Sequence, residues 1–151
     1  MLQISKADYD MIRWEAERSY PHECCGILLG TVQSGQRKVT LTVPCENMHH
    51  DSPQNRYSID PERVIAALKL ARSRSETIVG FYHSHPDHPP MYSGTDLAEA
   101  HWFDCSYVIT AVDAGRAGAT HSFVLQGSED KKRLEEEEID LVAYQRMPIA
   151  L

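Results

Sequence analysis

The sequence IVGFYHSH, residues 78–85, joins an apolar run to two histidines that stand one residue apart. The apolar character of residues 76–82 predicts a central buried strand, and we expect the strand pattern to continue to His85. Because side chains alternate between the two faces of a strand, His83 and His85 would point to the same face. The pair is either two ordinary imidazoles at a strand end or two ligands of one metal ion.

Ser93 and Asp96 follow the histidines at the spacing of a helix start. A serine N-cap with an acidic residue three positions later resembles a capping box and suits the helix dipole, so a structural explanation suffices for this half alone. Asp96 can also supply an oxygen ligand from the first helical turn. Ligands of the type His83, His85 and Asp96 leave one tetrahedral position for water, as in a catalytic zinc site.

Glu23 is the candidate for the general base. It stands after Pro21 and before the apolar segment 24–29, a place where a charged residue needs a specific reason. If this segment forms a strand beside the strand of His83, the Glu23 carboxylate can reach water on the metal. The two halves of the pattern together with Glu23 supply the parts of a hydrolytic centre.

The composition is that of an ordinary globular protein. The 151 residues are 42% hydrophobic and 25% charged, which argues against disordered and membrane classes and predicts one domain over residues 1–151. The net charge of −7 argues against a protein built to bind nucleic acid. The N-terminal residues lack the pattern of a targeting segment, so we expect a cytoplasmic protein without a membrane partner.

The four cysteines are Cys24, Cys25, Cys45 and Cys105, and their spacing matches neither a disulfide framework nor a Cys-x-x-Cys zinc site. We expect reduced and mostly buried thiols. Metal binding by His22 with Cys24 or Cys25 is a weaker alternative, and no role is assigned to these two cysteines.

Hydrophobic periodicity predicts a single α/β unit in which helices and strands intermix. We expect helices at 5–20, from 60–61 onward, at 93–103 and at 129–144, and strands at 23–31, 37–43, 76–82, 107–112 and 120–125. Residues 44–59 are predicted to be a loop with a short strand at its end. The glutamates at 135–138 are interpreted as a solvated face of the last helix.

Glu23, His83-Ser-His85 and, seven residues later, Ser93-x-x-Asp96 resemble the motif of the JAMM (MPN+) zinc metalloproteases. Residues 21–30, 55–61 and 80–83 are also similar to the short bacterial and archaeal branch of this family. The resemblance implies a single-domain JAMM/MPN-like, cytidine deaminase-like fold, with a mixed central β-sheet flanked by α-helices.

The resemblance also implies the roles of the site residues. His83, His85 and Asp96 would hold Zn²⁺, with water as the fourth ligand. Zinc lowers the pKa of bound water to about 7. Glu23 would take the proton of that water and pass it to the leaving amine, and Ser93 would donate a hydrogen bond to the oxyanion.

The implied activity is hydrolysis of a peptide or isopeptide bond, with trimming of residues after the Gly-Gly of a small ubiquitin-like sulfur-carrier protein as the expected reaction. The loop Asn47–Tyr57 is the candidate for substrate binding. A non-catalytic MPN-type interaction scaffold and a deubiquitinase-like isopeptidase are the alternatives, although the insertions of the large eukaryotic members are absent. The sequence leaves open whether the chain forms a homodimer.

Two other zinc hydrolase classes do not fit the sequence. Zinc deaminases of nucleosides have His-x-Glu followed by Pro-Cys-x-x-Cys, and this chain has neither. Zincins have His-Glu-x-x-His, but His22-Glu23 is followed by Gly26 at the position of the second histidine.

Overall fold

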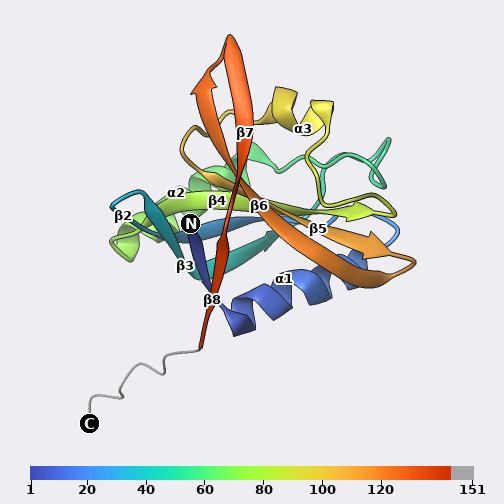
Figure 1. The fold of residues 1–151 in the computed structure, drawn as a ribbon, viewed down its shortest axis with the longest axis horizontal. Coiled ribbons are helices and arrows are strands. Elements are labelled where there is room, and N and C mark those ends of the chain that lie inside the picture. The colour runs from blue at the N-terminus through green and yellow to red at the C-terminus, as the bar shows by residue number, and fades with distance from the viewer. Residues whose placement is uncertain (144–151) are drawn as a thin grey trace.

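A computed structural model describes residues 1–143 of the chain, and these residues form one mixed sheet with three helices. The strand order is β7-β6-β5-β4-β2-β3-β1-β8 (Figure 1). The strands are β1 (Leu2–Ser5), β2 (Cys25–Gln33), β3 (Gln36–Cys45), β4 (Thr77–Pro86), β5 (Ser106–Asp113), β6 (Arg116–Ser128), β7 (Lys131–Glu137) and β8 (Ile139–Val142).

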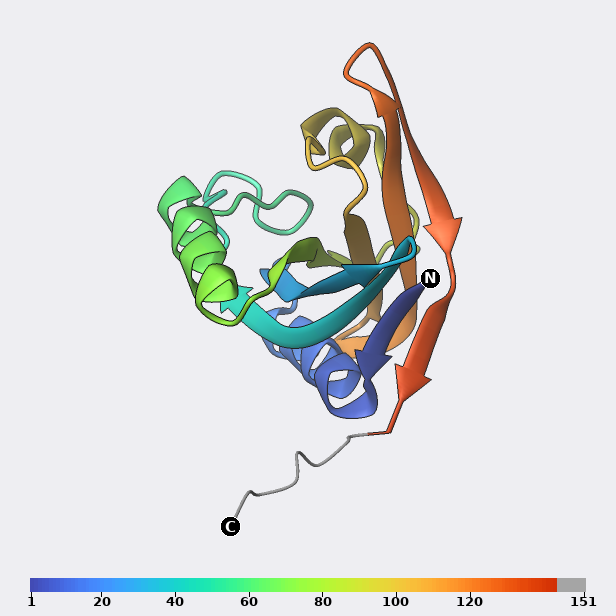
Figure 2. The same ribbon diagram turned by 90° about the vertical axis from the view of Figure 1, so that its left-hand side faces the viewer.

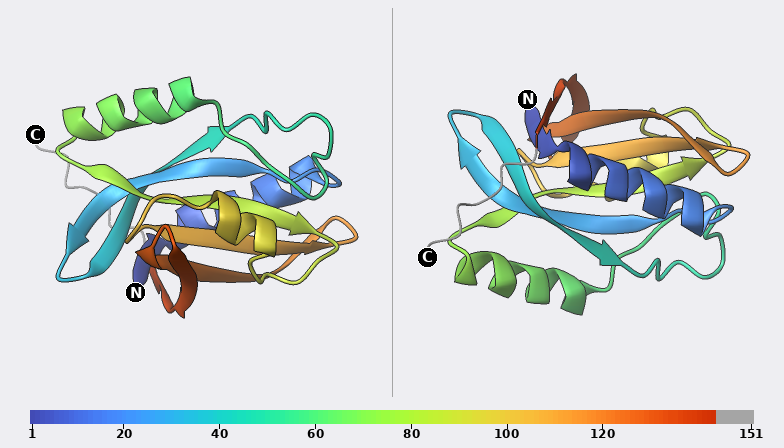
Figure 3. Two further views of the ribbon diagram at one scale, coloured as in Figure 1. Left: turned by 90° about the horizontal axis from the view of Figure 1, so that it is seen from above. Right: turned by 90° about the horizontal axis from the view of Figure 1, so that it is seen from below.

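The three helices lie on both faces of this sheet. They are α1 (Lys6–Ser19), α2 (Pro61–Ser73) and the short α3 (Gly94–Glu99). Figures 2 and 3 show α1 and α2 on opposite sides of the strands. Side-chain caps begin the two longer helices, because Ser5 Oγ accepts the N–H of Asp8 and Asp60 Oδ1 accepts the N–H of Glu62.

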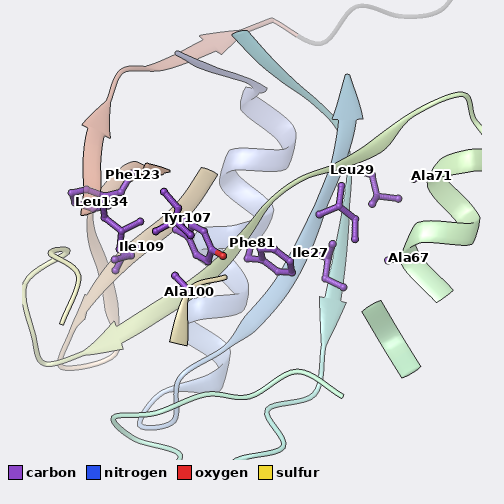
Figure 4. Packing of buried hydrophobic residues seen from close by; sticks show 12 residues of the cluster. Ile27, Leu29, Ala67, Ala71, Phe81, Ala100, Tyr107, Ile109, Phe123 and Leu134 are labelled. Carbon is purple, nitrogen blue, oxygen red and sulfur yellow. The ribbon is translucent and has the colours of Figure 1, made fainter. Parts of the chain in front are cut away.

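Two buried clusters, one on each face, hold the helices to the sheet. Ile12 and Ala16 of α1 pack with strand residues such as Leu28 and Val79. Ala67 and Ala71 of α2 belong to the opposite cluster, which Figure 4 shows to continue through Ile27, Leu29, Phe81 and Tyr107 to Phe123 and Leu134. The helices are thus fixed by apolar burial, which is the dominant favourable contribution to folding.

The strand β4 lies between antiparallel β2 and parallel β5. In this register Cys25 is directly opposite His83, so the start of β2 lies beside the histidine end of β4. Gly26 allows this close approach, because a Cβ atom there would come within 2.2 Å of the Tyr82 ring. Any other residue at position 26 would displace the Tyr82 ring, which packs on the α1 side of the sheet.

The two outer strands of the sheet are joined directly through Glu138. β7 pairs with β6 at one edge, β8 pairs with β1 at the other, and Leu2 N–H donates to the Glu138 carbonyl at 2.9 Å. The sheet is therefore curled, and in Figure 2 β7 and β8 run along one side of the molecule next to β1. No helix in residues 1–143 has the length and apolarity that crossing a membrane would require.

Most of the predicted elements are confirmed: the first helix, the hairpin of β2 and β3, α2, β4, β5 and β6 all occur where the periodicity placed them. The thiols Cys24, Cys25 and Cys105 are buried, Cys45 is partly buried, and none of the four forms a disulfide. The charged residues Lys69 and Arg72 of α2 and its C-cap Arg74 are exposed.

The predicted last helix is wrong. Residues 131–142 form β7 and β8 instead, and the expected end at Tyr144 lies outside the described residues. Helix propensity of the glutamates is outweighed by pairing with β6, in which Leu134 is opposite Leu125 and is buried. Glu137 is not solvated, because its side chain is only 6% exposed.

The structure differs from the prediction at α3, at β3 and at β1. The helix α3 ends at Glu99 rather than near Phe103, because Trp102 and Phe103 turn in to pack against the core. β3 continues to Cys45, and residues 46–60 contain no strand. The strand β1 was not predicted, since only four residues carry its pattern.

Candidate active site

The two histidines enter the site from β4, as the alternation predicts. Both side chains are buried, and their Nε2 atoms are 3.2 Å apart. His85 Nδ1 lies 2.8 Å from the Pro89 carbonyl, which can only accept a hydrogen bond, so Nδ1 carries the proton. This contact orients Nε2 toward the site, as an outer hydrogen bond does for a metal-binding histidine.

Asp96 reaches the same place from the first turn of α3. Its carboxylate lies 3.4 Å from His83 Nε2 and 3.1 Å from His85 Nε2. A reciprocal capping box fixes it, because Ser93 Oγ accepts the Asp96 N–H and Asp96 Oδ2 accepts the Ser93 N–H. The cap predicted from the sequence therefore also positions the third side chain of the group.

The three residues can hold a metal ion. One atom from each of His83, His85 and Asp96 lies within 4.8 Å of the others, and this is the one such group of three among residues 1–143. Zinc bonds of about 2.0–2.1 Å in a tetrahedron separate the ligand atoms by about 3.3 Å. The distance of 3.2 Å between the two Nε2 atoms is close to that value, and one carboxylate oxygen of Asp96 lies 3.4 Å from His83 Nε2 while the other lies 3.1 Å from His85 Nε2.

Burial and mutual contacts shift the pKa values of His83, His85 and Asp96. Burial lowers the pKa of His83, since the charged imidazolium is disfavoured there. Burial alone would also lower the pKa of His85, but hydrogen bonds with Asp96 and Pro89 raise it. Burial would raise the pKa of Asp96, whereas the hydrogen bonds from both histidines hold it far below its usual range. The site therefore stabilises a carboxylate facing two imidazoles.

Glu23 lies beside this group with a carboxylate oxygen that has no protein partner. Its side chain is buried, and Oε1 accepts no hydrogen bond from the residues that the structure describes. Burial raises its pKa to about 8, partly opposed by the positive charge of His85. A buried polar atom without a partner is costly, so this oxygen indicates a ligand that the protein atoms do not provide.

The main chain around Glu23 is held from two sides. Its N–H donates to the Pro53 carbonyl at 2.6 Å, and Asn47 Nδ2 donates to its carbonyl at 3.2 Å. The next residue, Cys24, donates its N–H to Ser84 Oγ at 2.8 Å. Ser84, between the two histidines, thus ties β2 to β4 and fixes the carboxylate against the histidine end.

The five predicted site residues come together. Glu23, His85 and Ser93 line one hollow of about 350 Å³, and His83 and Asp96 lie next to His85 in the group of three. The alternative with His22 and cysteines is not supported, because His22 is exposed and takes no part in the group. Burial raises the pKa of the Cys24 thiol to about 12, which keeps it protonated.

Sequence reasoning missed several supporting residues. The Tyr57 ring stacks on His83, with ring centroids 4.4 Å apart. Asn47 holds the ends of its loop together by bonding Glu23, Arg56, His49 and Ser58. Both residues lie within the loop predicted to bind substrate, but its lack of periodicity gave no sign of what each one contacts.

Known proteins share this architecture and the segment that carries the site. A model of the prokaryotic homologs of the JAB domain matches residues 5–126. A desampylase from Haloferax volcanii is 39% identical over 93 residues, which are 62% of this chain and 65% of that protein. The chain thus matches slightly less than two thirds of the length of this relative.

Two further similarities extend over more of the chain. A protein of Thermus thermophilus, described as a probable TtuB-protein conjugate cleaving protease, is 37% identical over 117 residues, or 78% of this chain and 74% of that protein. The solution structure of a Desulfitobacterium hafniense protein superposes with a TM-score of 0.81 at 28% identity, covering 95% of this chain and 94% of that one. With the family match spanning all five site residues, the chain belongs to the prokaryotic homologues of the JAB domain.

Proposed function

We propose that this protein is a zinc-dependent metallopeptidase that cleaves the bond following the C-terminal Gly-Gly of a small ubiquitin-like protein. The observation that carries the proposal is the convergence of His83, His85 and Asp96 beside the unpaired buried oxygen of Glu23. A buried carboxylate next to an open metal site is the arrangement that metal-assisted hydrolysis of an amide requires.

In the proposed mechanism His83, His85 and Asp96 would hold a zinc ion. The ion would lower the pKa of a water molecule and so supply a nucleophile at neutral pH. Glu23 accepts the proton and delivers it to the leaving amine, a double role that suits a carboxyl whose pKa is raised toward neutrality by burial. With a divalent cation bound nearby, the pKa of Glu23 would be lower and its basic form would be favoured.

Ser93 is proposed to stabilise the charge that develops on the carbonyl oxygen. Its Oγ accepts the Asp96 N–H at 3.0 Å, which leaves the hydroxyl proton free to donate. The side chain also lines the hollow that contains Glu23 and His85. A capping serine at this position can therefore donate to substrate without losing its structural bond.

The substrate class rests on the relatives. One is named a desampylase and the other a protease that cleaves protein conjugates, which favours an isopeptide bond between a ubiquitin-like modifier and a lysine. Linear extensions after Gly-Gly present the same carbonyl to the site, and we include them. The finer proposal, that the modifier is also a sulfur carrier, rests on the family resemblance, and a cytoplasmic location stays a prediction.

The test uses two substrates made from one ubiquitin-like sulfur carrier. In the first, extra residues follow Gly-Gly, and in the second, Gly-Gly is joined to a lysine side chain of another protein. Zinc-loaded enzyme should release the carrier ending in Gly-Gly from both, as measured by mass spectrometry. Unchanged masses with full zinc content would exclude this substrate class, whereas normal zinc content in a His83→Ala/His85→Ala variant would exclude the proposed metal site.

A further inference from the structure

The strand β7 forms one edge of the sheet, and its side away from β6 pairs with no other strand of residues 1–143. In Figure 2 β7 runs along the outside of the molecule, and its hairpin with β6 extends past the other strands. A free edge presents a row of unpaired N–H and C=O groups, which can pair with a strand of another chain.

The hydrogen bonds of Leu125 on β6 show which main-chain groups of β7 point outward. Its N–H and its carbonyl both bond to residues 104–105, on the side away from β7. Leu134, directly opposite Leu125, therefore exchanges no ladder bond with it, and its own N–H and C=O point to the free edge. The same orientation recurs at every second residue, so the main-chain groups of Lys132 and Glu136 also point outward.

The charges along β7 change sign at Leu134. Lys131, Lys132 and Arg133 precede this residue, and Glu135, Glu136 and Glu137 follow it. Two antiparallel copies of the strand, with Leu134 opposite Leu134, would bring each basic residue opposite an acidic one. Parallel copies in register would bring like charges together, which is destabilising. The strand is therefore complementary to itself in the antiparallel orientation.

Arg133 and Glu135 are the charged side chains best placed for such a contact. They are 59% and 56% exposed, and within one copy Arg133 Nε lies 2.6 Å from Glu135 Oε1. Exposed ion pairs contribute little to stability, so this contact can be exchanged for the equivalent one with a second copy at a small cost. By contrast, the Lys132 ammonium group donates to the Ala98 and Ala100 carbonyls, and Glu137 is bound by Arg37.

We propose that this protein forms a symmetric homodimer in which the β7 strands of two copies pair antiparallel, with Leu134 opposite Leu134. The outward main-chain groups of Lys132, Leu134 and Glu136 form the ladder, and Arg133 of each copy faces Glu135 of the other. A twofold axis through the Leu134 pair relates the two copies, so the same surface serves on both sides of the interface.

The proposed interface leaves the candidate active site accessible. The hollow lined by Glu23, His85 and Ser93 has no residue of β7 in its lining. The dimer would therefore carry two open sites, and the inference does not depend on the proposed function.

The test is the mass of the protein in solution, measured by analytical ultracentrifugation from micromolar to millimolar concentration. The unmodified protein should reach twice the mass of one copy, with a Kd that rises with salt because the cross-strand contacts are partly electrostatic. Arg133→Glu and Glu135→Arg each bring like charges together across the interface. Either variant should raise the Kd of the dimer by about 10-fold or more.

An equal mixture of the two variants tests the register of the pairing. A copy with Arg133→Glu has two negative charges at these positions, and a copy with Glu135→Arg has two positive ones. The mixed dimer therefore has attractive contacts on both sides of its axis, and the mixture should associate as the unmodified protein does. This recovery would also show that both variants are folded.

The matched control is Lys6→Glu, which breaks another exposed ion pair, Lys6–Asp10 on α1. It should leave the Kd unchanged. An unmodified protein that stays monomeric at millimolar concentration would overturn the homodimer and leave the edge solvated or open to a different protein. A dimer that persists in both single variants, or a mixture that does not associate, would also overturn the proposed interface.

Discussion

Two buried glutamates, Glu23 and Glu137, occupy opposite environments in one sheet. Glu23 lies just before the first residue of β2. Its Oε1 atom has no hydrogen-bond partner among the described residues, and burial raises its pKa to about 8. Burial alone would also raise the pKa of Glu137, but hydrogen bonds from Ser106, Arg37 and Ser122 hold it below its usual value. The difference shows that burial alone does not identify a functional carboxylate, whereas a missing partner does.

The Glu137 site is a closed structural cluster. Arg37 Nη2 lies 2.7 Å from one carboxylate oxygen, and the hydroxyls of Ser106 and Ser122 donate to the other at 2.6 and 2.8 Å. Arg37 also donates to the Asp104 carbonyl at 3.1 Å. With both oxygens occupied, Glu137 connects β7 with β3, β5 and β6 and has no free atom for a ligand.

The largest expected effect is on catalysis at Glu23. Glu23→Gln keeps the size of the side chain but removes the proton acceptor, so kcat/KM for the carrier substrate should fall by about 10²- to 10⁴-fold. Zinc content and thermal stability should stay at the level of the unmodified protein. A variant that keeps its activity would show that Glu23 is a structural carboxylate like Glu137.

The counterpart is Glu137→Gln, which should unfold more easily and remain active when folded. Removing one partner of a buried ion pair leaves Arg37 uncompensated and should lower the free energy of unfolding by about 3–5 kcal/mol. Urea denaturation measures this change, and kcat measured below the unfolding transition should be unaffected. A loss of kcat in fully folded protein would contradict the division of roles.

Two serines extend the comparison. Ser93→Ala should lower kcat by about 10²- to 10³-fold, as loss of one oxyanion donor does, with a smaller change in zinc affinity. Ser122→Ala removes a donor from Glu137 and should cost about 1–3 kcal/mol of stability without a change in kcat. Equal losses of turnover and zinc affinity in Ser93→Ala would mean that Ser93 acts only through the position of Asp96.

The pH dependence of stability in metal-free protein should have opposite signs for the two carboxylates. The folded pKa of Glu23 is raised, so its contribution is fully present below the unfolded pKa near 4.5 and is lost as pH rises toward about 8. The folded pKa of Glu137 is lowered, so its contribution is present above the unfolded pKa and is lost as pH falls.

Unfolding curves at several pH values test these signs. Between pH 4.5 and about 8, the stability of the unmodified protein relative to Glu23→Gln should fall by up to about 1.4 kcal/mol per pH unit. The same comparison with Glu137→Gln should show its change only at lower pH. Parallel curves for both variants would mean that the two environments are alike.

The arrangement of the candidate site residues was predictable from sequence because its parts follow local rules. Alternation along β4 put His83 and His85 on one face, and the cap pattern placed Asp96 at the start of α3. Placing Glu23 at the site required one further assumption, namely that β2 and β4 are neighbouring strands. The register confirms it, because Cys25 is opposite His83. The apolar runs of β2, β4 and β5 likewise fixed the central strands.

The Glu137 cluster could not be predicted in the same way. Its members Arg37, Ser106, Ser122 and Glu137 come from four strands, and none belongs to a local pattern. Residues 135–138 have the propensity of a helix, and only the pairing of β7 with β6 overrides it. The Glu137 cluster forms only when strands that are distant in the sequence pair with one another. A short stretch of sequence contains no information on such pairing.

The reciprocal cap between Ser93 and Asp96 also bears on how the proposed zinc ion would bind. The carboxylate is oriented by its own helix before any cation arrives, so binding need not order α3. Hydrogen exchange of the α3 amides should then be similar with and without zinc. Chelation would strip the ion and leave the scaffold in place, and activity would return on adding zinc without a refolding step.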